Sequence, residues 1–316
     1  MDNPGSTAGL DGALKVGDAL ERDKLDRRGF ASSVVAALNK VGRESALVVS
    51  VEGDWGSGKT STLAMIEALL LQKETPPVIV HFNPWLVGDR DALLRLFLSK
   101  IATAVKLTDH ASDGKKVAKE LKAYANAFDV IKLIPGAEPF ASIIKSVISA
   151  MGDATGAVSD YKTPDIESRK QKVEKALREF GRPIIVFIDD IDRLFLNEVF
   201  EMVRIVKAVG DLPNVGYVLA WDPKYVQKSL ECVSVPQSNT YLDKIVQVRM
   251  PLPALSITAK EALLNDAVAQ LPPDAREDYF GGDEDRFSML YFSGLRELLE
   301  RPRDVIRISF QQGSFL

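Results

Sequence analysis

The sequence has little of what several protein classes require. Its 316 residues include one cysteine, Cys232, and two histidines, His81 and His110. A single cysteine excludes an internal disulfide framework and suits a reducing compartment, so we expect a cytoplasmic protein. Two histidines exclude a histidine-rich metal site. The formal net charge is −4 at pH 7, so composition predicts no basic face for nucleic acid.

Long apolar runs are also missing. The most apolar stretch, residues 128–158, is broken by charged side chains, and its longest uncharged piece runs only from Ser146 to Gly152. A spanning helix needs roughly 20 apolar residues. The N-terminus has no apolar secretory core either. We therefore expect no membrane association, with an interfacial amphipathic helix as the alternative for this stretch.

One glycine-rich segment carries the clearest chemistry. Residues 53–60 read GDWGSGKT and fit the phosphate-loop pattern Gly-x-x-x-x-Gly-Lys-Thr at every fixed position. The apolar run before it, 46–51, predicts a buried parallel strand, and residues 61–70 predict a helix. Glycines let backbone N–H groups surround an anion, and the helix N-terminus adds its positive end. This context favours a phosphate site over a simple glycine-rich turn.

The residues of this loop receive separate roles. Lys59 should reach the β- and γ-phosphates, and the hydroxyl of Thr60 should bind Mg²⁺. The other expected nucleotide-binding residues of the segment are Gly53, Asp54, Trp55, Gly56, Ser57, Gly58 and Ser61.

Two acids follow a second buried strand. The run Ile184–Ile188 precedes Asp189 and Asp190, and ligands bind beyond the carboxyl ends of parallel strands. Asp189 is the natural Mg²⁺ partner of Thr60, while Asp190 stands where a carboxylate could orient the attacking water. Adjacent carboxylates are costly there unless a metal ion or cations compensate them. The set predicts hydrolysis of the β–γ phosphoanhydride.

A missing sequence element indicates which nucleotide the chain binds. A GTPase would carry an Asn-Lys-x-Asp element downstream of the metal-binding acid. The chain's one Asn-Lys pair, Asn39-Lys40, lies upstream of the phosphate loop and lacks the Asp. ATP is therefore the expected nucleotide, with Mg²⁺ as its ion.

Patterning divides the chain into three parts. Residues 1–44 form an N-terminal segment and helix, 45–254 an α/β core, and 255–316 a helical lid. Within the core, 108–165 interrupts the alternation of strands and helices and is expected to be a helical insertion. Further strands are expected at 78–82, 215–222 and 245–248, with Pro251 and Pro253 closing the layer.

Short elements along the chain resemble, in residues and in order, those of the KAP family of P-loop NTPases. The resemblance extends from about Asp23 to Ile308. Its elements are Trp55, Phe82-Asn83-Pro84-Trp85, Asp189-Asp190-Ile191-Asp192-Arg193, Ala220-Trp221-Asp222, the run from Tyr241 to Gln247, and Arg301-Pro302-Arg303.

The resemblance implies a three-layer core with strand order 5-1-4-3-2. It places Asp222 beside the γ-phosphate, in sensing or in a structural pairing with a basic residue. It implies that Arg303 of the lid contacts the γ-phosphate, as a catalytic residue that reports the nucleotide state. Lys244 and Arg193 are candidate cations for a neighbour's site, or local partners of Asp243 and Asp192. Family members often carry membrane helices where 108–165 lies, but this chain lacks the apolar length.

Two functions remain open at this stage. The first is an ATP-hydrolysing switch or motor that acts on protein partners in a multi-protein complex, which the resemblance associates with bacterial antiviral defence. The alternative is a nucleotide-gated assembly scaffold with little or no hydrolysis. A small-molecule kinase shares the phosphate loop but fits the paired acids and the late arginine less well. Self-association is left open.

Overall fold

The fold is that of a computed structural model, which describes residues 13–84, 90–131, 166–233, 238–269, 289, 291–295 and 301–304. Expectations on other residues, including Trp85 and most of 128–158, lie outside the described residues. Five parallel strands form one sheet in the order β2-β3-β4-β1-β5. Their bounds are β1 Leu47–Glu52, β2 Val78–Phe82, β3 Ile184–Ile188, β4 Val215–Trp221 and β5 Val248–Pro251.

The strand order confirms the expected 5-1-4-3-2, read from the other edge of the sheet. The three central strands, β1, β3 and β4, are buried at every position. Continuous burial is what their predominantly apolar sequences predict, because a parallel sheet is covered on both faces. β4 lies between β1 and β3 and is parallel to both, so the carboxyl ends of the three strands lie at the same end of the sheet.

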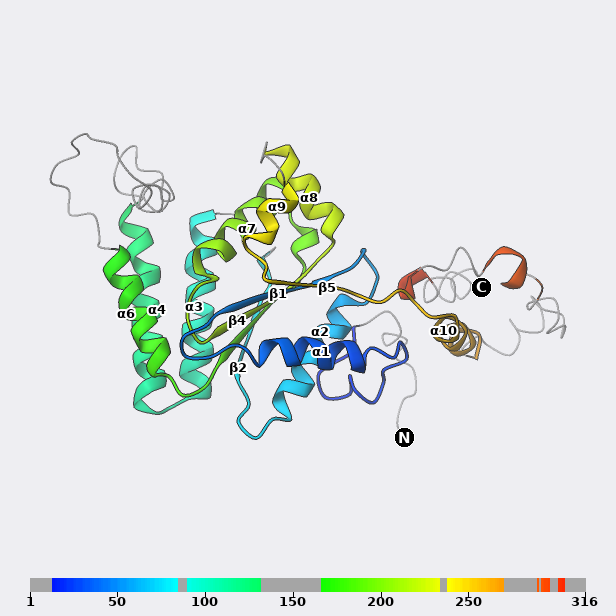
Figure 1. Cartoon of the computed structure of the whole chain (residues 1–316), viewed down its shortest axis with the longest axis horizontal. Coiled ribbons are helices and arrows are strands. Elements are labelled where there is room, and N and C mark those ends of the chain that lie inside the picture. The colour runs from blue at the N-terminus through cyan, green and yellow to red at the C-terminus, as the bar shows by residue number, and fades with distance from the viewer. Residues whose placement is uncertain are drawn as a thin grey trace, which may run out of the picture.

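Helices cover both faces of the sheet (Figure 1). One face packs against α1 (Arg28–Leu38) and α2 (Lys59–Leu71) through a core that includes Val34 and Ile66. The other face packs against α3 (Arg90–Thr108), α7 (Leu196–Val209) and α8 (Pro223–Cys232), with Phe97 and Tyr217 among the buried residues. The chain is thus a three-layer α/β core.

The fifth strand differs from its sequence expectation. It was expected at 245–248, but it begins at Val248 and includes Pro251. The apolar pair Ile245 and Val246 instead closes the turn after α9 (Ser238–Asp243), where both amides donate to the carbonyl of Leu242. β5 pairs only with β1 in the described sheet, and a proline is tolerated at the end of such an edge strand.

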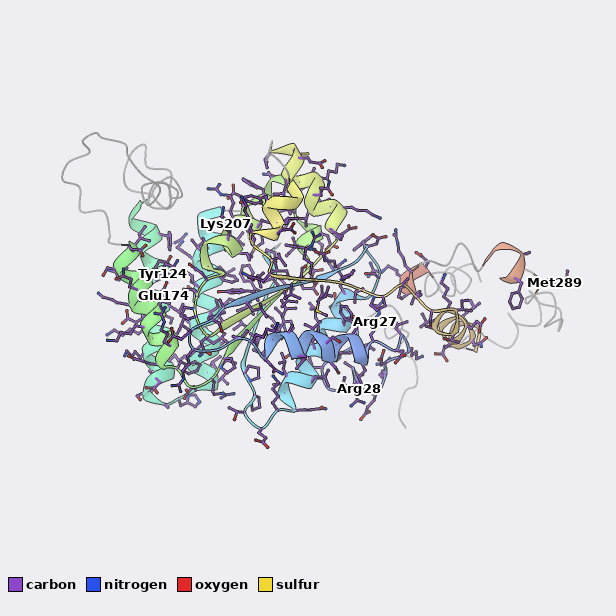
Figure 2. The ribbon with its side chains drawn as sticks, in the orientation of Figure 1. Arg27, Arg28, Tyr124, Glu174, Lys207 and Met289 are labelled. Carbon is purple, nitrogen blue, oxygen red and sulfur yellow. The ribbon has the colours of Figure 1, made fainter. Side chains whose placement is uncertain are left out.

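Of the expected insertion, 108–165, the structure describes residues 108–131, and their helix packs between two helices that flank the insertion. α3 packs against α4 (Ser112–Ile131), and α4 packs against α6 (Ile166–Glu179). Figure 2 shows Tyr124 of α4 and Glu174 of α6 at the end of the molecule opposite α10. Burial raises the pKa of the Tyr124 hydroxyl. In the described part of the chain, no helix has the length and apolarity to cross a membrane.

The lid follows β5. α10 (Ile257–Ala269) lies beyond the edge of the sheet in Figure 1. A short π-helical turn at Tyr291–Leu295 and residues 301–304 are the other described pieces of this region. The boundaries 1–44, 45–254 and 255–316 stay predictions, because no comparison tests them.

Candidate active site

The glycine-rich segment forms a tight loop between β1 and α2. Gly56 and Gly58 have φ angles of +81° and +89°, which residues with a side chain rarely adopt. A Cβ on Gly56 would lie 3.1 Å from Arg303, and one on Gly58 would lie 3.1 Å from Arg27. The backbone conformation therefore favours glycine at both positions, and the arginines pack tightly against them.

Lys59 is the first residue of α2, and its side chain folds back over the loop. Its ammonium donates to the carbonyls of Gly53 at 2.9 Å and Asp54 at 3.3 Å. It also lies 2.9 Å from the carboxylate of Asp192. The Lys59 side chain is only 7% exposed, so this charge is held at the base of the pocket rather than in solvent.

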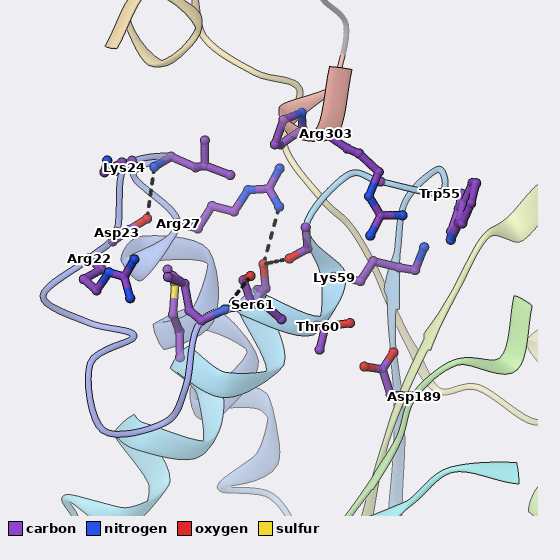
Figure 3. A pocket seen from close by; sticks show the side chains of 18 of the residues that line it. Arg22, Asp23, Lys24, Arg27, Trp55, Lys59, Thr60, Ser61, Asp189 and Arg303 are labelled. Atoms are coloured by element: carbon purple, nitrogen blue, oxygen red, sulfur yellow. Dashed lines mark hydrogen bonds between the residues drawn. The ribbon is translucent and has the colours of Figure 1, made fainter. Parts of the chain in front are cut away.

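Thr60 and Asp189 meet as the expected metal-binding pair. The Thr60 hydroxyl faces the Asp189 carboxylate, and both residues line the same pocket (Figure 3). Burial raises the pKa of Asp189, and the nearby charges of Asp190 and Asp192 raise it further, while the Thr60 hydroxyl and the Asp190 amide, which donates to Asp189 at 2.8 Å, lower it in part. A hydroxyl beside a carboxylate whose charge is poorly compensated is a donor set that suits Mg²⁺.

The two other acids of this segment point to different partners. Asp190 has a left-handed backbone, φ 59°, and its carboxylate lies 2.6 Å from Nε of Arg193. The short helix Ile191–Arg193 then turns Asp192 toward Lys59. Arg193 therefore pairs with Asp190 and not with Asp192, and its side chain is 55% exposed at the pocket.

A buried arginine ties the phosphate loop to two other segments. Arg27 donates to the carbonyl of Ser57 at 2.6 Å and to that of Pro253, just after β5, at 3.4 Å. It also donates to the Thr62 hydroxyl at 3.4 Å. Burial lowers the pKa of its guanidinium. Arg27 lines the pocket and fixes the loop between the N-terminal segment and the start of the lid.

The N-terminal segment and α10 form the pocket wall away from the acids. Leu14 donates its amide to the Ser61 hydroxyl at 3.1 Å, which anchors the segment on α2. Lys24 of the segment forms an ion pair with Asp266 of α10. Leu25, Met65 and Leu263 add apolar surface, so one end of the pocket is charged and the other mixed.

The lid reaches the phosphate loop through two arginines. The Arg303 guanidinium carbon lies 5.0 Å from the centre of the Trp55 ring, and Figure 3 shows the guanidinium above the Lys59 side chain. Arg301 lies 3.6 Å from the Asp54 carboxylate, which Lys224 of α8 approaches from the core at 3.4 Å. Asp54 therefore joins the lid to the core.

Two expected residues lie elsewhere. The Asp222 carboxylate caps α8, accepting hydrogen bonds from the amides of Lys224 and Tyr225, and Asp222 does not line the pocket. Helix capping is thus sufficient to explain an acid at the end of β4. The role of Asp222 beside the γ-phosphate stays a prediction. Lys244 lies beside Ala46 and Gly210, near the start of β1, so it is at the opposite end of the sheet from the phosphate loop.

A buried charge supports the loop from below. Glu52, the last residue of β1, accepts hydrogen bonds from Ser50 at 2.8 Å and from the Trp221 indole at 3.3 Å. Arg249 of β5 lies 2.7 Å from the same carboxylate. The network joins β1, β4 and β5 directly beneath Gly53.

The structure therefore gathers most of the expected site residues into one pocket. Lys59, Thr60, Asp189, Asp190 and Arg303 all line it. Sequence reasoning missed Arg27, for which the linear pattern carries no signal, because its partners lie 30 and 226 positions away. It also gave Asp192 no role at the phosphate loop, although the acid-rich motif contains this residue. The roles of individual residues stay predictions.

The chain is similar to several known proteins. The family described as KAP family P-loop domain matches residues 27–308. The phage T7 exclusion protein of Escherichia coli (strain K12) is 30% identical over 266 residues, which cover 78% of this chain and 35% of that protein. The chain thus spans about a third of the length of this relative.

Two solved structures are also similar. The Aeropyrum pernix ORC1 protein, solved in complex with DNA, has a TM-score of 0.40 and 14% identity, with 83% of this chain and 56% of that one covered. The Aeropyrum pernix ORC2 protein, solved as ADPNP-ADP complexes, has a TM-score of 0.38 and 13% identity over 94% and 72% of the two chains. The family match extends over nearly all of the sequence, and the chain belongs to the KAP family of P-loop NTPases.

Proposed function

We propose that this chain binds ATP with Mg²⁺ and hydrolyses it, and that the cycle drives a switch or motor in a multi-protein complex. The observation that carries the proposal is the meeting of Thr60 and Asp189 beside Lys59 in one pocket. Thr60 and Asp189 would hold Mg²⁺, which would neutralise charge on the phosphates. Lys59 would bind the β- and γ-phosphates, and the loop amides would bind the phosphate oxygens.

The lid contacts support a switch. Arg303 packs on Trp55 above the Lys59 side chain, where its guanidinium would reach a γ-phosphate after a small movement. Loss of the γ-phosphate on hydrolysis would return Arg303 to the ring. Because Arg27 holds both the phosphate loop and the carbonyl of Pro253, a shift of the loop would pass to the start of the lid. Arg303 would thus report the nucleotide state to α10.

The experiment for binding is calorimetric titration with ATP and Mg²⁺. We expect wild type to bind ATP in preference to GTP, and Lys59→Ala to lose most of the affinity. Lys73→Ala, in the turn after α2 and away from the pocket, is the matched control. Equal binding by wild type and Lys59→Ala would overturn the proposed site. Labelled γ-phosphate should pass to water and not to a small acceptor, which would exclude a kinase.

The size of the assembly distinguishes the scaffold alternative from the switch. Light scattering with and without ATP, in wild type and in Asp189→Asn and Asp190→Asn, compares assembly with phosphate release. A switch requires the size to change again as ATP is consumed. ATP-dependent assembly that survives Asp190→Asn, with no phosphate release by wild type, would instead favour the scaffold.

The biological setting is proposed from the relative. The name of the Escherichia coli protein, phage T7 exclusion protein, supports a role in bacterial antiviral defence. We expect cells that express the gene to lower phage plating, and cells with Lys59→Ala to plate phage as empty cells do. Equal protection by both versions would show that nucleotide binding is not needed for defence.

A further inference from the structure

The starting observation is the ion pair between Lys59 and Asp192. The ammonium and carboxylate lie 2.9 Å apart, and the two side chains are 7% and 9% exposed. The buried Oδ2 of Asp192 makes no hydrogen bond among the described residues, so its ion pair with the Lys59 ammonium is what balances the charge. A buried carboxylate that depends on one cation is costly once that cation moves away.

The ammonium of Lys59 has three oxygen partners in this arrangement. It has three N–H donors. Two of these meet the carbonyls of Gly53 and Asp54, and the Asp192 carboxylate takes the remaining side of the ammonium. A phosphate that is to bind Lys59 must therefore displace one of these three partners. Asp192 is the one that carries a negative charge, and a phosphate would repel it.

The position of Asp192 follows from the same contact. If Lys59 binds the β- and γ-phosphates, a carboxylate that touches its ammonium lies beside the γ-phosphate. Asp190 is placed differently, because its carboxylate is bound to the half-exposed Arg193. Of the two acids beyond Asp189, the one that faces the phosphate-binding lysine is thus Asp192.

We propose that Asp192 competes with the γ-phosphate for Lys59 and that, once displaced, its carboxylate orients the attacking water. This inference rests on the proposed function. In the hydrolytic step, the water oxygen bonds to the γ-phosphorus as the bond to the β–γ bridging oxygen breaks. ADP leaves with that electron pair, and Asp192 accepts a proton from the water. Inorganic phosphate is the other product, and the proton then passes to solvent.

A purely structural role makes a different prediction. If Asp192 only stabilised Lys59, its removal would weaken the binding of both ADP and ATP. If Asp192 competes with the γ-phosphate, its removal strengthens the binding of the triphosphate more than that of the diphosphate. The ratio of the two affinities therefore separates the roles, whether or not hydrolysis occurs.

The test is calorimetric binding of ADP and of a non-hydrolysable ATP analogue, with Mg²⁺, to wild type and Asp192→Asn. We expect Asp192→Asn to bind the analogue about 3- to 10-fold more tightly, since a charged competitor is removed. ADP affinity should change less. Glu67→Gln is the matched control, because Glu67 is a buried carboxylate of α2 that pairs with His81 outside the pocket. This variant should leave the ratio unchanged.

Phosphate release from ATP is measured on the same samples. It should fall at least about 100-fold in Asp192→Asn, which is the usual contribution of a positioned acid or base. Asp192→Glu serves if Asn at this position prevents folding. It keeps the charged competitor, so its analogue affinity should stay near that of wild type, while the displaced carboxylate should slow release.

Analogue binding that is unchanged or weaker in Asp192→Asn would overturn the competition, as would Asp192→Glu binding the analogue more tightly than wild type. Release at the wild-type rate would overturn the role toward water. If wild type releases no phosphate, hydrolysis and the role toward water fail together, while the affinity ratio still decides the competition.

Discussion

The guanidinium carbon of Arg303 lies 5.0 Å from the centre of the Trp55 ring, so a lid arginine covers a side chain of the phosphate loop itself. Trp55 is 55% exposed, and a Cβ on the neighbouring Gly56 would lie 3.1 Å from Arg303. Loop and lid are therefore in contact at the point where a γ-phosphate would bind. Movement of Arg303 is expected to be visible at Trp55.

The first prediction concerns this contact. Binding of a non-hydrolysable ATP analogue should change tryptophan emission, because Arg303 leaves the Trp55 ring for the γ-phosphate, whereas ADP should change it less. Arg303→Ala should lower phosphate release by about 10² to 10³, the usual cost of one lost donor at developing charge. Trp55→Phe should remove the emission change. A full change that persists in Trp55→Phe would place the signal at another tryptophan.

A second prediction concerns Arg27. Arg27→Met should lower the free energy of unfolding by about 2 kcal/mol, since the carbonyls of Ser57 and Pro253 lose a charged donor. It should also weaken ATP binding, because the loop loses its support. Arg28→Met is the matched control: Figure 2 labels both side chains, and Arg28 is exposed. Equal unfolding midpoints for the two variants would contradict this account.

A third prediction concerns Asp189 and pH. Because burial raises its pKa in the folded state, the ionised carboxylate costs stability without ligand. This cost is absent below the ordinary carboxylate pKa and develops as pH rises through the raised folded value. Asp189→Asn should therefore melt higher than wild type at neutral pH, and the difference should vanish in acid. With ATP and Mg²⁺ the order should reverse, because only wild type gains ligand stabilisation.

The melting temperatures are compared by calorimetry between about pH 3 and 8, a range that includes the usual titration of carboxylates. An Asp189→Asn variant that melts below wild type at every pH without ligand would show that the carboxylate is stabilising there. The account of Asp189 as a metal-binding residue would then lose its electrostatic support.

A fourth prediction concerns the buried network under the loop. Glu52→Gln should cost about 1–3 kcal/mol of unfolding free energy in denaturant titrations, because Arg249 and the Trp221 indole lose a charged acceptor. Glu179→Gln breaks an exposed ion pair with Lys116 and should leave the midpoint nearly unchanged. If both variants unfold at the same denaturant concentration, the Glu52 network does not hold the strands beneath the loop.

Local sequence patterns predicted three strands of the sheet and the glycine-rich loop. Unbroken apolar runs predicted β1, β3 and β4, and the spacing of Gly53, Gly58 and Lys59 predicted the phosphate loop. The strand order came from family resemblance, because the pairing of distant strands is not readable from local pattern. β5 was placed three residues early, since an apolar run predicts burial without showing whether it is buried in a strand or after a helix.

The site was predictable only for residues that belong to a motif beside a predicted strand. Lys59, Thr60 and Asp189 follow strands whose ends must meet, so their proximity follows from the topology. Arg27 acts through backbone carbonyls, which any residue carries, and no pattern of side chains marks such partners. The partners of Asp190 and Asp192 depend on a short helix whose turn direction is set by the left-handed backbone at Asp190.

The most direct test of the central claim is phosphate release from ATP by wild type, with Mg²⁺ and with the ion chelated, beside Lys59→Ala and Asp189→Asn. Because Lys59→Ala leaves Asp192 unpaired, circular dichroism should first show that each variant is folded. The account predicts that wild type releases phosphate only when Mg²⁺ is present. Both variants should release it at least about 100-fold more slowly. Release that continues without Mg²⁺, or that is equal in Asp189→Asn, would contradict it.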